Sequence, residues 1–252
     1  MDRRAVDLAV VSDVHLGTAA CQAEALHAYL RSIAPRRLVL AGDIVDLWHL
    51  RSGAWTPAQT RVVRRVLKLA AHGCEVTWLA GNHDGALRRF IPFTAAGIAV
   101  HDELLLDLDG VRTWFVHGDL ADALIATPRW LALIGWHGYD VVQWLGDRLD
   151  GARRLVGLPR RSLAAAIKAR IPAALRHAER FAGVMARLAA ERGAGAVVCG
   201  HIHVPADRVI ADRHPPVRYL NSGDWVDSLS ALEWDAGRWR SVRWDQAAAI
   251  AA

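Results

Sequence analysis

His201 and His203 stand two residues apart in the segment GHIH (200–203), directly after an apolar run. Alternate side chains of an extended segment lie on one face, so the two imidazoles can aim in the same direction. Asp13 and His15 repeat this arrangement near the N-terminus, again after an apolar run. Imidazole and carboxylate pairs of this kind are typical of a site for a divalent metal ion. The alternative is a strand end that carries two polar residues by chance.

Polar side chains also follow other short apolar runs, at Asp43, Asn82 and His117. In open α/β sheets the loops at the carboxyl ends of the strands gather at one edge, so side chains from separate segments can meet there. Five segments contribute to this set of candidate metal ligands, and its members are Asp13, His15, Asp43, Asn82, His117, His201 and His203.

The donor types in this set indicate one kind of chemistry. Carboxylate, imidazole and amide donors without a thiolate favour Mn²⁺, Fe²⁺ or Zn²⁺ in a catalytic role over a structural zinc. Seven ligands exceed one tetrahedral site, whereas two ions that share a carboxylate would use them all. Such a pair activates a hydroxide and neutralises the attacking and leaving oxygens on phosphorus. Glycines directly before Asp43, Asn82 and His201 allow sharp turns and a close approach of the backbone.

The elements that must position these residues follow from the apolar pattern. Continuous apolar runs predict buried strands at Val6–Ser12, Arg37–Ala41, Glu75–Ala80, Val111–Val116, Ala196–Cys199 and Val217–Leu220. Apolar residues at three- and four-residue steps predict helices at Gln22–Ser32 and Pro57–His72, with Thr56 as an N-cap. Leu229–Trp234 and Trp239–Trp244 are expected to form a hairpin. We therefore expect an α/β core with helices on its outer faces.

The segment from about 120 to 192 has no strand pattern and is rich in Ala, Leu and Arg. We expect a helical insertion, or cap, within a single domain of residues 1–252. Ten basic residues and two acidic ones lie between Gly151 and Arg192, whereas the whole chain carries a net charge of +5. This local excess favours an anionic partner, such as nucleic acid, lipid head groups or a phosphorylated substrate. A solvated helix face is the alternative.

Composition sets the compartment and the class. The chain has 252 residues, of which 53% are hydrophobic, so disorder is not expected. Its three cysteines are scattered without a CxxC pair, which fits a reducing compartment. Neither a signal peptide nor a long apolar run is evident. We expect a cytoplasmic protein, soluble or peripheral on a membrane.

Five blocks stand in an order that resembles the calcineurin-like metallophosphoesterases: SDVHLG (12–17), GDIVD (42–46), GNHD (81–84), HGD (117–119) and GHIH. The resemblance implies a four-layer α/β/β/α sandwich with the insertion between the HGD and GHIH blocks. It also implies two divalent metal ions, with Mn²⁺ as the first expectation and Fe²⁺ or Zn²⁺ as alternatives.

The same resemblance assigns roles to the candidate residues. One metal ion would be held by Asp13, His15, Asp43 and His203, and the other by Asp43, Asn82, His117 and His201, with Asp43 as the bridge. His83 would stabilise or protonate the leaving oxygen, and Asp84 would orient His83. Asp46 is expected to support the site or form a turn rather than to bind a metal ion.

Within this superfamily the chain resembles the UDP-2,3-diacylglucosamine hydrolases of lipid A synthesis. The resemblance rests on GDIVDLW (42–48), on RRSLAAAI (160–167) and on the place of the insertion. It implies cleavage of a pyrophosphate to UMP and 2,3-diacylglucosamine 1-phosphate, and contact with anionic lipid at the inner membrane. His83 departs from the best-known members of that branch, which carry Arg there. The candidate substrate contacts are Trp48, Arg88, Asp122 and Arg161.

Three other functions stay open. A metallophosphoesterase could act on soluble phosphodiesters or nucleotide pyrophosphates, with the insertion as an ordinary cap. A nuclease would use the basic insertion for DNA or RNA, but the insertion has no recognisable nucleic-acid module and mixes its charges with large apolar residues. A scaffold without activity is disfavoured because the ligand set is complete.

Overall fold

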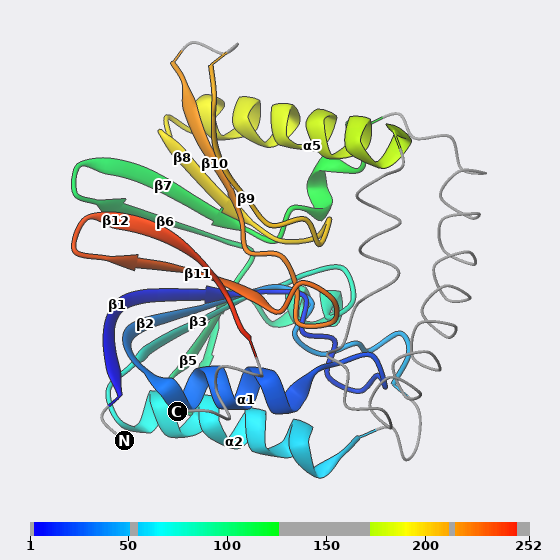
Figure 1. Ribbon diagram of the computed structural model, residues 1–252, viewed down its shortest axis with the longest axis vertical. Helices are drawn as coiled ribbons and strands as arrows, with labels where there is room; N and C mark the ends of the chain where they lie inside the picture. The colour runs from blue at the N-terminus through cyan, green and yellow to red at the C-terminus, as the bar shows by residue number, and fades with distance from the viewer. Residues whose placement is uncertain (1–2, 51–54, 126–171, 212–214, 246–252) are drawn as a thin grey trace. The chain divides into compact units, whose positions relative to one another are not determined.

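The computed structural model describes residues 3–50, 55–125, 172–211 and 215–245 (Figure 1). Its strands are β1 (Arg4–Val11), β2 (Ile33–Ala41), β3 (Glu75–Leu79), β4 (Phe93–Ala95), β5 (Ile98–His101), β6 (Glu103–Leu108), β7 (Val111–Val116), β8 (Ala196–Cys199), β9 (Ala206–Ile210), β10 (Val217–Asn221), β11 (Ser230–Asp235) and β12 (Arg238–Arg243). Its helices are α1 (Ala23–Ser32), α2 (Pro57–Ala71) and α5 (Pro172–Glu191), with the short 3₁₀ helices η1 (Gly85–Phe90) and η2 (Asp119–Ala121). The chain divides into two compact units, one of residues 1–119 and 185–244, the other of residues 120–184 and 245–252.

The first unit contains two mixed β-sheets. The larger sheet has the strand order β12-β11-β1-β2-β3-β5-β4, and the smaller has the order β6-β7-β8-β10-β9. The central strands β1, β2, β3 and β5 run parallel to one another, as do β7, β8 and β10 in the smaller sheet. Antiparallel strands β4, β12, β6 and β9 occupy the edges. The carboxyl ends of the parallel strands in each sheet therefore lie along one edge.

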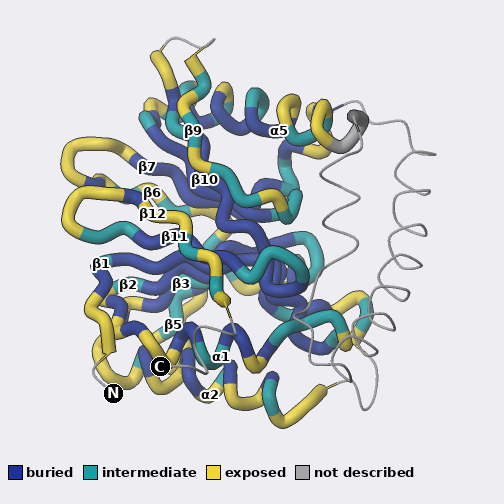
Figure 2. Tube along the Cα trace, in the orientation of Figure 1, coloured by how far each residue is buried: buried dark blue, intermediate teal, exposed yellow. Residues whose placement is uncertain are grey.

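The two sheets pack face to face around an apolar core (Figure 2). Leu8 and Val39 of the larger sheet share this core with Phe115, Val198 and Leu220 of the smaller sheet. The opposite face of the larger sheet packs against α1 and α2. The residues buried there include Leu38 and Leu40 of β2, Val11 of β1, Leu26 of α1 and Val66 of α2. Because the central strands are buried on both faces, their sequences are continuous apolar runs and do not alternate between apolar and polar residues.

The last turns of α5 belong to the same unit and bury Met185, Ala186 and Ala189. The guanidinium of Arg192, just after this helix, lies 4.2 Å from the ring centroid of Trp114 on β7. The end of α5 is therefore anchored on the smaller sheet, and helices lie on the outer side of each sheet. The predicted α/β/β/α sandwich is confirmed.

The apolar runs predicted the central strands well, and the boundaries of β7 and β8 are those expected. Strands β4, β5, β6 and β9 were not predicted. Strand β2 begins at Ile33 rather than Arg37 because it pairs with β1 from its first residue. Helix α5 lies within the expected helical insertion, whereas residues 126–171, including Arg161 and the RRSLAAAI segment, lie outside the described residues.

Thr56 caps the N-terminus of α2, as predicted. The hydroxyl of Thr56 accepts a hydrogen bond from the backbone N–H of Gln59, whose side chain in turn accepts one from the backbone N–H of Thr56. We expect Thr56→Ala to lower the free energy of unfolding by about 1 kcal/mol, because one backbone donor loses its partner. Urea unfolding followed by circular dichroism measures this change. Thr56→Ser keeps the hydroxyl and should unfold like the parent, and equal midpoints for Ala and Ser would contradict the cap.

Candidate metal centre

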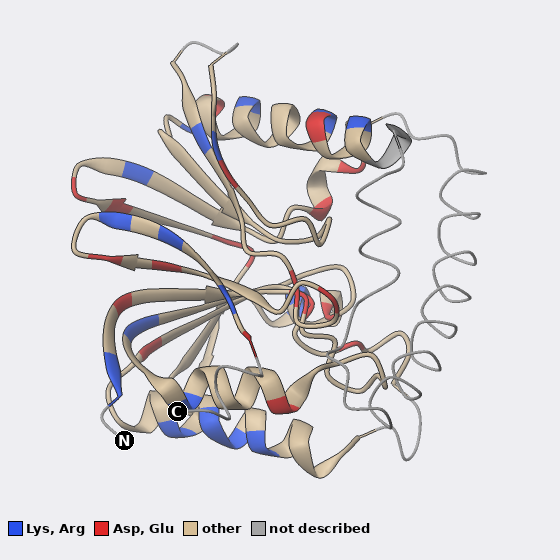
Figure 3. Cartoon of the chain, viewed as in Figure 1, with Lys and Arg blue, Asp and Glu red and all other residues tan. Residues whose placement is uncertain are grey.

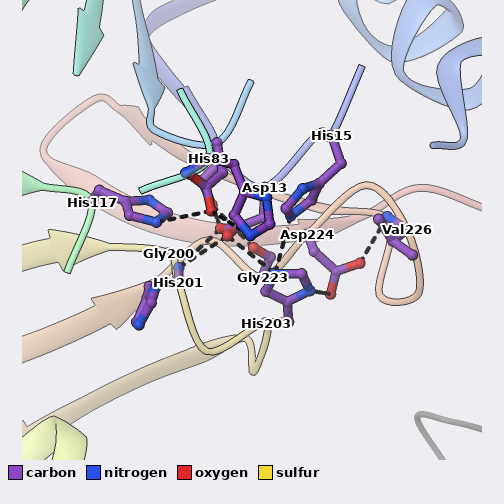
Figure 4. Close-up of polar contacts among 12 residues, drawn as sticks. Asp13, His15, His83, His117, Gly200, His201, His203, Gly223, Asp224 and Val226 are labelled. Carbon is purple, nitrogen blue, oxygen red and sulfur yellow. Dashed lines mark hydrogen bonds and ion pairs between the residues drawn. The ribbon is translucent and has the colours of Figure 1, made fainter. Parts of the chain in front are cut away.

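Each of the five predicted segments delivers its polar residue just past the end of a parallel strand. Asp13 and His15 follow β1, and Asp43 follows β2. Asn82, His117 and the pair His201 and His203 follow β3, β7 and β8. Figure 4 labels Asp13, His15, His117, His201 and His203 in one small region, together with His83. All seven candidate ligands lie within the first unit.

Asp13, His15 and His203 form one group, in which each residue offers a ligand atom within 4.8 Å of the other two. The Nε2 atom of His203 lies 3.2 Å from Oδ1 of Asp13 and 3.4 Å from Nε2 of His15. Asp13 is fully buried. The backbone N–H of His201 also donates to its carboxylate. This carboxylate is therefore fixed, and two imidazoles face it.

Asp43, His117 and His201 form a second group with the same spacing. The Nε2 atom of His117 lies 3.2 Å from Oδ2 of Asp43 and 3.2 Å from Oδ1 of Asn82. The other ring nitrogen, Nδ1, lies 2.9 Å from the carbonyl oxygen of Ala41, which fixes the ring with Nε2 toward the carboxylate. The amide of Asn82 thus joins the second group through His117.

Asp43 also belongs to a third group with His15 and His83, so its carboxylate lies between the two sides of the centre. The donor set consists of carboxylates, imidazoles and one amide, which suits Mn²⁺, Fe²⁺ or Zn²⁺. Cys199 precedes the GHIH segment, but its thiol is buried and accepts a hydrogen bond from Asn221. The described residues therefore fit a dinuclear site of nitrogen and oxygen donors.

Positive φ angles mark the candidate ligands. The backbone angle φ lies between 51° and 69° at Asp13, His15, Asp43, His201 and His203. Residues other than glycine rarely adopt such values. Such conformations persist only where the surrounding structure enforces them, and they gather at functional sites. The amides of Asp13 and His15 donate to the carbonyl oxygens of Gly42 and Asp43, so the loops after β1 and β2 hold each other in this form.

The glycines before three of these residues provide room for the ligands. A Cβ on Gly42 would lie 2.4 Å from the ring of His117, and one on Gly81 would lie 2.2 Å from the carboxylate of Asp43. A Cβ on Gly200 would lie 2.2 Å from the carboxylate of Asp13. The expected close approach of the backbone is confirmed, and only Gly42 among the three has a positive φ.

Burial and proximity shift the pKa values in the centre. Burial disfavours the ionised form of Asp13, but the charges of His203, His117 and His15 hold its pKa well below the usual range. The pKa of Asp43 is lowered in the same way, against burial, chiefly by His117. Burial opposes the protonation of His117 in turn, but Asp43 and Asp13 raise its pKa to about 10. To bind a metal ion through Nε2, His117 must release this proton.

His83 is positioned by a different carboxylate from the one expected. Both oxygens of Asp84 accept hydrogen bonds from the turn around them, from the backbone amides of Gly81 and Ile44 and the indole of Trp78. Asp84 therefore holds the GNHD turn, and no described contact joins it to the ring of His83. The Nδ1 atom of His83 instead lies 3.0 Å from Oδ2 of Asp46, short enough for an ion pair but without hydrogen-bond alignment.

Asp46 contacts three imidazoles. Besides His83, its carboxylate lies 3.2 Å from Nδ1 of His15 and 3.0 Å from Nδ1 of His49. Burial would raise the pKa of Asp46, but the close contacts with the imidazoles of His15, His83 and His49 hold it far below its usual range. Its expected role outside the metal ligands agrees with these contacts. In the sequence, Asp46 is recognisable as a second carboxylate three residues after Asp43.

A family model for calcineurin-like phosphoesterases matches residues 6–205, which include every one of these groups. The chain belongs to the calcineurin-like phosphoesterase family. It is thus a metal-dependent phosphoester hydrolase.

Relatives named UDP-2,3-diacylglucosamine hydrolase resemble this phosphoesterase over most of its length. The protein from Nitrosococcus oceani is 28% identical over 236 residues, which cover 88% of each chain. The protein from Aeromonas salmonicida is 25% identical over 243 residues, covering 91% of this chain and 90% of that one. Among solved structures, an archaeal phosphodiesterase aligns with a TM-score of 0.47 and 12% identity, over 94% of this chain and 98% of that one.

The predicted substrate contacts lie in different surroundings in the phosphoesterase. The indole of Trp48 is half exposed, and its centroid is 4.3 Å from that of His83, so it lies at the rim of the metal centre. Arg88 binds Asp102, Asp119 and the carbonyl oxygen of Ala80. Asp122 is exposed in the second unit. Trp48 thus contacts His83 beside the centre.

Asp224, which the sequence analysis left out, completes the surroundings of His203. Its Oδ1 atom accepts hydrogen bonds from the backbone amides of Val226, Asp227 and Ser228. Its Oδ2 atom is buried without a hydrogen-bond partner and lies 3.8 Å from Nδ1 of His203 (Figure 4). Imidazoles that bind metals commonly direct their second nitrogen to a carboxylate, which sets the tautomer. The sequence could have indicated Asp224, because this residue also follows the end of a predicted strand.

We expect Asp224→Asn to weaken metal binding about 10- to 100-fold, because the carboxylate no longer orients His203. Asparagine keeps the oxygen that accepts the three backbone hydrogen bonds, so the loop should stay folded. Calorimetric titration of the metal-free protein with Mn²⁺ measures the change, and circular dichroism checks the fold. Asp235→Asn is the matched control, since that carboxylate pairs with Arg240 on the β11–β12 hairpin. Equal affinities in the two variants would contradict this role.

Proposed function

We propose that this phosphoesterase hydrolyses the pyrophosphate of UDP-2,3-diacylglucosamine to UMP and 2,3-diacylglucosamine 1-phosphate at a dinuclear metal centre. The observation that carries the reaction class is the convergence of the carboxylates of Asp13 and Asp43 with imidazoles from four loops. Support for the substrate comes from the names of relatives that align over about nine tenths of both chains.

The ligand assignment follows the two groups of side chains. Asp13, His15 and His203 would hold one ion, Asn82, His117 and His201 the other, and Asp43 would contribute to both. When bound, the two ions would supply an activated hydroxide and positive charge for the oxygens on phosphorus. Mn²⁺ is the metal ion proposed for both positions, because the carboxylate and amide oxygens suit it, while Fe²⁺ and Zn²⁺ also fit the imidazoles.

His83 is the proposed general acid. Its Nε2 atom faces the centre, 4.0 Å from Oδ2 of Asp43, while Nδ1 faces Asp46. A proton on Nε2 would be placed to pass to the leaving oxygen. Asp84 keeps the GNHD turn in shape and thereby fixes the backbone that carries His83. Trp48, stacked against His83, would provide an apolar wall for the substrate.

A phosphoesterase acting on soluble diesters or nucleotide pyrophosphates is the second candidate. The chemistry of the centre serves both candidates equally, since the ligands and His83 act on phosphorus and not on the lipid. A nuclease ranks lower. The described part of α5 carries the basic residues Arg176, Arg180 and Arg187 together with the acidic residues Glu179 and Glu191, and Figure 3 shows charges of both signs on this helix.

A substrate panel with the Mn²⁺-loaded protein tests the proposed reaction. We expect the highest kcat/KM on UDP-2,3-diacylglucosamine, with UMP as a product, over UDP-sugars, bis-p-nitrophenyl phosphate and single-stranded DNA. The relatives' names and the exposed Trp48 beside the centre are the reasons. Asp43→Ala is the control and should abolish all hydrolysis, because it removes the shared carboxylate. Preference for an unacylated substrate would overturn the lipid assignment but leave the phosphoesterase chemistry in place.

We also propose that the protein contacts anionic lipid at the inner membrane surface. Within the described part of the chain, no helix has both the length and the apolar character needed to cross a bilayer. Ten basic residues between Gly151 and Arg192 would each add about 1 kcal/mol of attraction near an anionic surface.

Co-sedimentation tests this contact. The full chain should pellet with phosphatidylglycerol vesicles at low salt, stay in the supernatant with phosphatidylcholine vesicles, and lose its binding as salt rises because the attraction is screened. Equal recovery with both vesicle types would contradict an electrostatic contact.

A further inference from the structure

Asp46, His49 and His83 form a further group of ligand atoms beside the candidate dinuclear centre. Each offers one atom, and the three atoms lie within 4.8 Å of one another. The Nδ1 atoms of His49 and His83 lie 3.0 Å from the same oxygen of Asp46, Oδ2. None of these three residues belongs to the seven proposed metal ligands.

The spacing and the donor types match zinc. Around a tetrahedral zinc ion with bonds of about 2.0–2.2 Å, neighbouring ligand atoms are about 3.4 Å apart. Two imidazole nitrogens and a carboxylate oxygen are a common set of three protein ligands for zinc, with a fourth position left for water. The carboxylate of Asp46 is buried at the base of this group, in contact with both imidazoles.

The two nitrogens of His83 face different neighbours. Nε2 points toward Asp43 and the dinuclear centre, whereas Nδ1 points toward Asp46. Nδ1 is buried and makes no aligned hydrogen bond, although Asp46 is close. His49 approaches from the loop after β2, and its side chain is 41% exposed, so an ion from solvent can reach it.

We propose that Asp46, His49 and His83 form a third cation site, which binds zinc and inhibits the enzyme when zinc is in excess. Zinc bound between Asp46, His49 and His83 would fix the ring of His83 through Nδ1, and any proton on that nitrogen would pass to solvent. With its ring fixed, His83 could not follow the leaving oxygen with Nε2, so protonation of that oxygen would slow. The inhibition, unlike the binding, rests on the proposed function of His83.

Zinc binding by the full-length, metal-stripped chain tests the site directly. Equilibrium dialysis against buffered Zn²⁺, followed by elemental analysis, gives the zinc bound per chain. His49→Gln removes one ligand and should lose one equivalent relative to the parent. His72→Gln is the matched control, because His72 is an exposed histidine at the end of α2 and should leave the count unchanged.

The difference between the parent and His49→Gln decides the proposal, whatever the total. Equal counts in both would overturn the third site. If the dinuclear centre were wrong, both totals would be low but the difference would remain, so the two failures are distinguishable.

Activity provides a second readout. With bis-p-nitrophenyl phosphate as the probe, the zinc-loaded parent should lose activity at excess Zn²⁺, while His49→Gln and the parent should be equally active at the lower zinc concentration that fills the centre alone. An equal loss in parent and variant at high zinc would overturn the inhibitory role.

Discussion

Two buried carboxylates near each other are the constraint on which this site depends. Asp13 and Asp43 are both shielded from water, and the charge of each opposes ionisation of the other. Ionised groups in such surroundings require positive charge nearby. Imidazoles from four loops surround the pair, and divalent cations would supply the same charge in concentrated form. The position of every histidine in the centre is understandable as a response to these two carboxylates.

The fold keeps these charged side chains together, and the backbone of the loops that carry them is strained as a result. Left-handed conformations at five candidate ligands each cost about 1–3 kcal/mol. The strands that precede them are buried between two layers, so their ends cannot move apart to relieve the strain. The hydrogen bonds from Val14 and His15 to the carbonyl oxygen of Asp43 join the first two loops. A rigid, two-sheet core thus stores strain in the loops, where it preorganises ligands.

The central strands and the seven clustered residues were predictable because both depend on local patterns. A strand buried on both faces must be apolar throughout, and the chain that leaves its carboxyl end must carry the functional residues. The missed strands β4, β6 and β9 are edge strands with at least one exposed face, and β4 has three residues. Glu103–Leu108 alternates between exposed and partly buried positions, which gives a weaker signal than a continuous run.

The outer contacts of the site were harder to predict because they depend on how loops fold back. Asp84 is next to His83 in the sequence, which favoured it as the partner of that ring. In three dimensions the GNHD turn directs Asp84 to backbone amides, and Asp46 from another loop faces His83 instead. Asp224 follows a strand end as the candidate ligands do, but the backbone amides of the loop after it bind its carboxylate. Adjacency in sequence is therefore a poor guide to which residues contact and orient the side chains of such a centre.

Asp46 links two parts of the chemistry through one carboxylate. It orients His15, a candidate ligand, and faces His83, the proposed acid. A cation bound through His15 would draw electron density from the shared carboxylate, and protonation of His83 would do the same from the other side. One carboxylate thus connects a candidate metal ligand with the proposed acid. A substitution at position 83 would change the group that faces this carboxylate. The ring of His83 is therefore held between Asp46 and Trp48, two residues of the loop after β2.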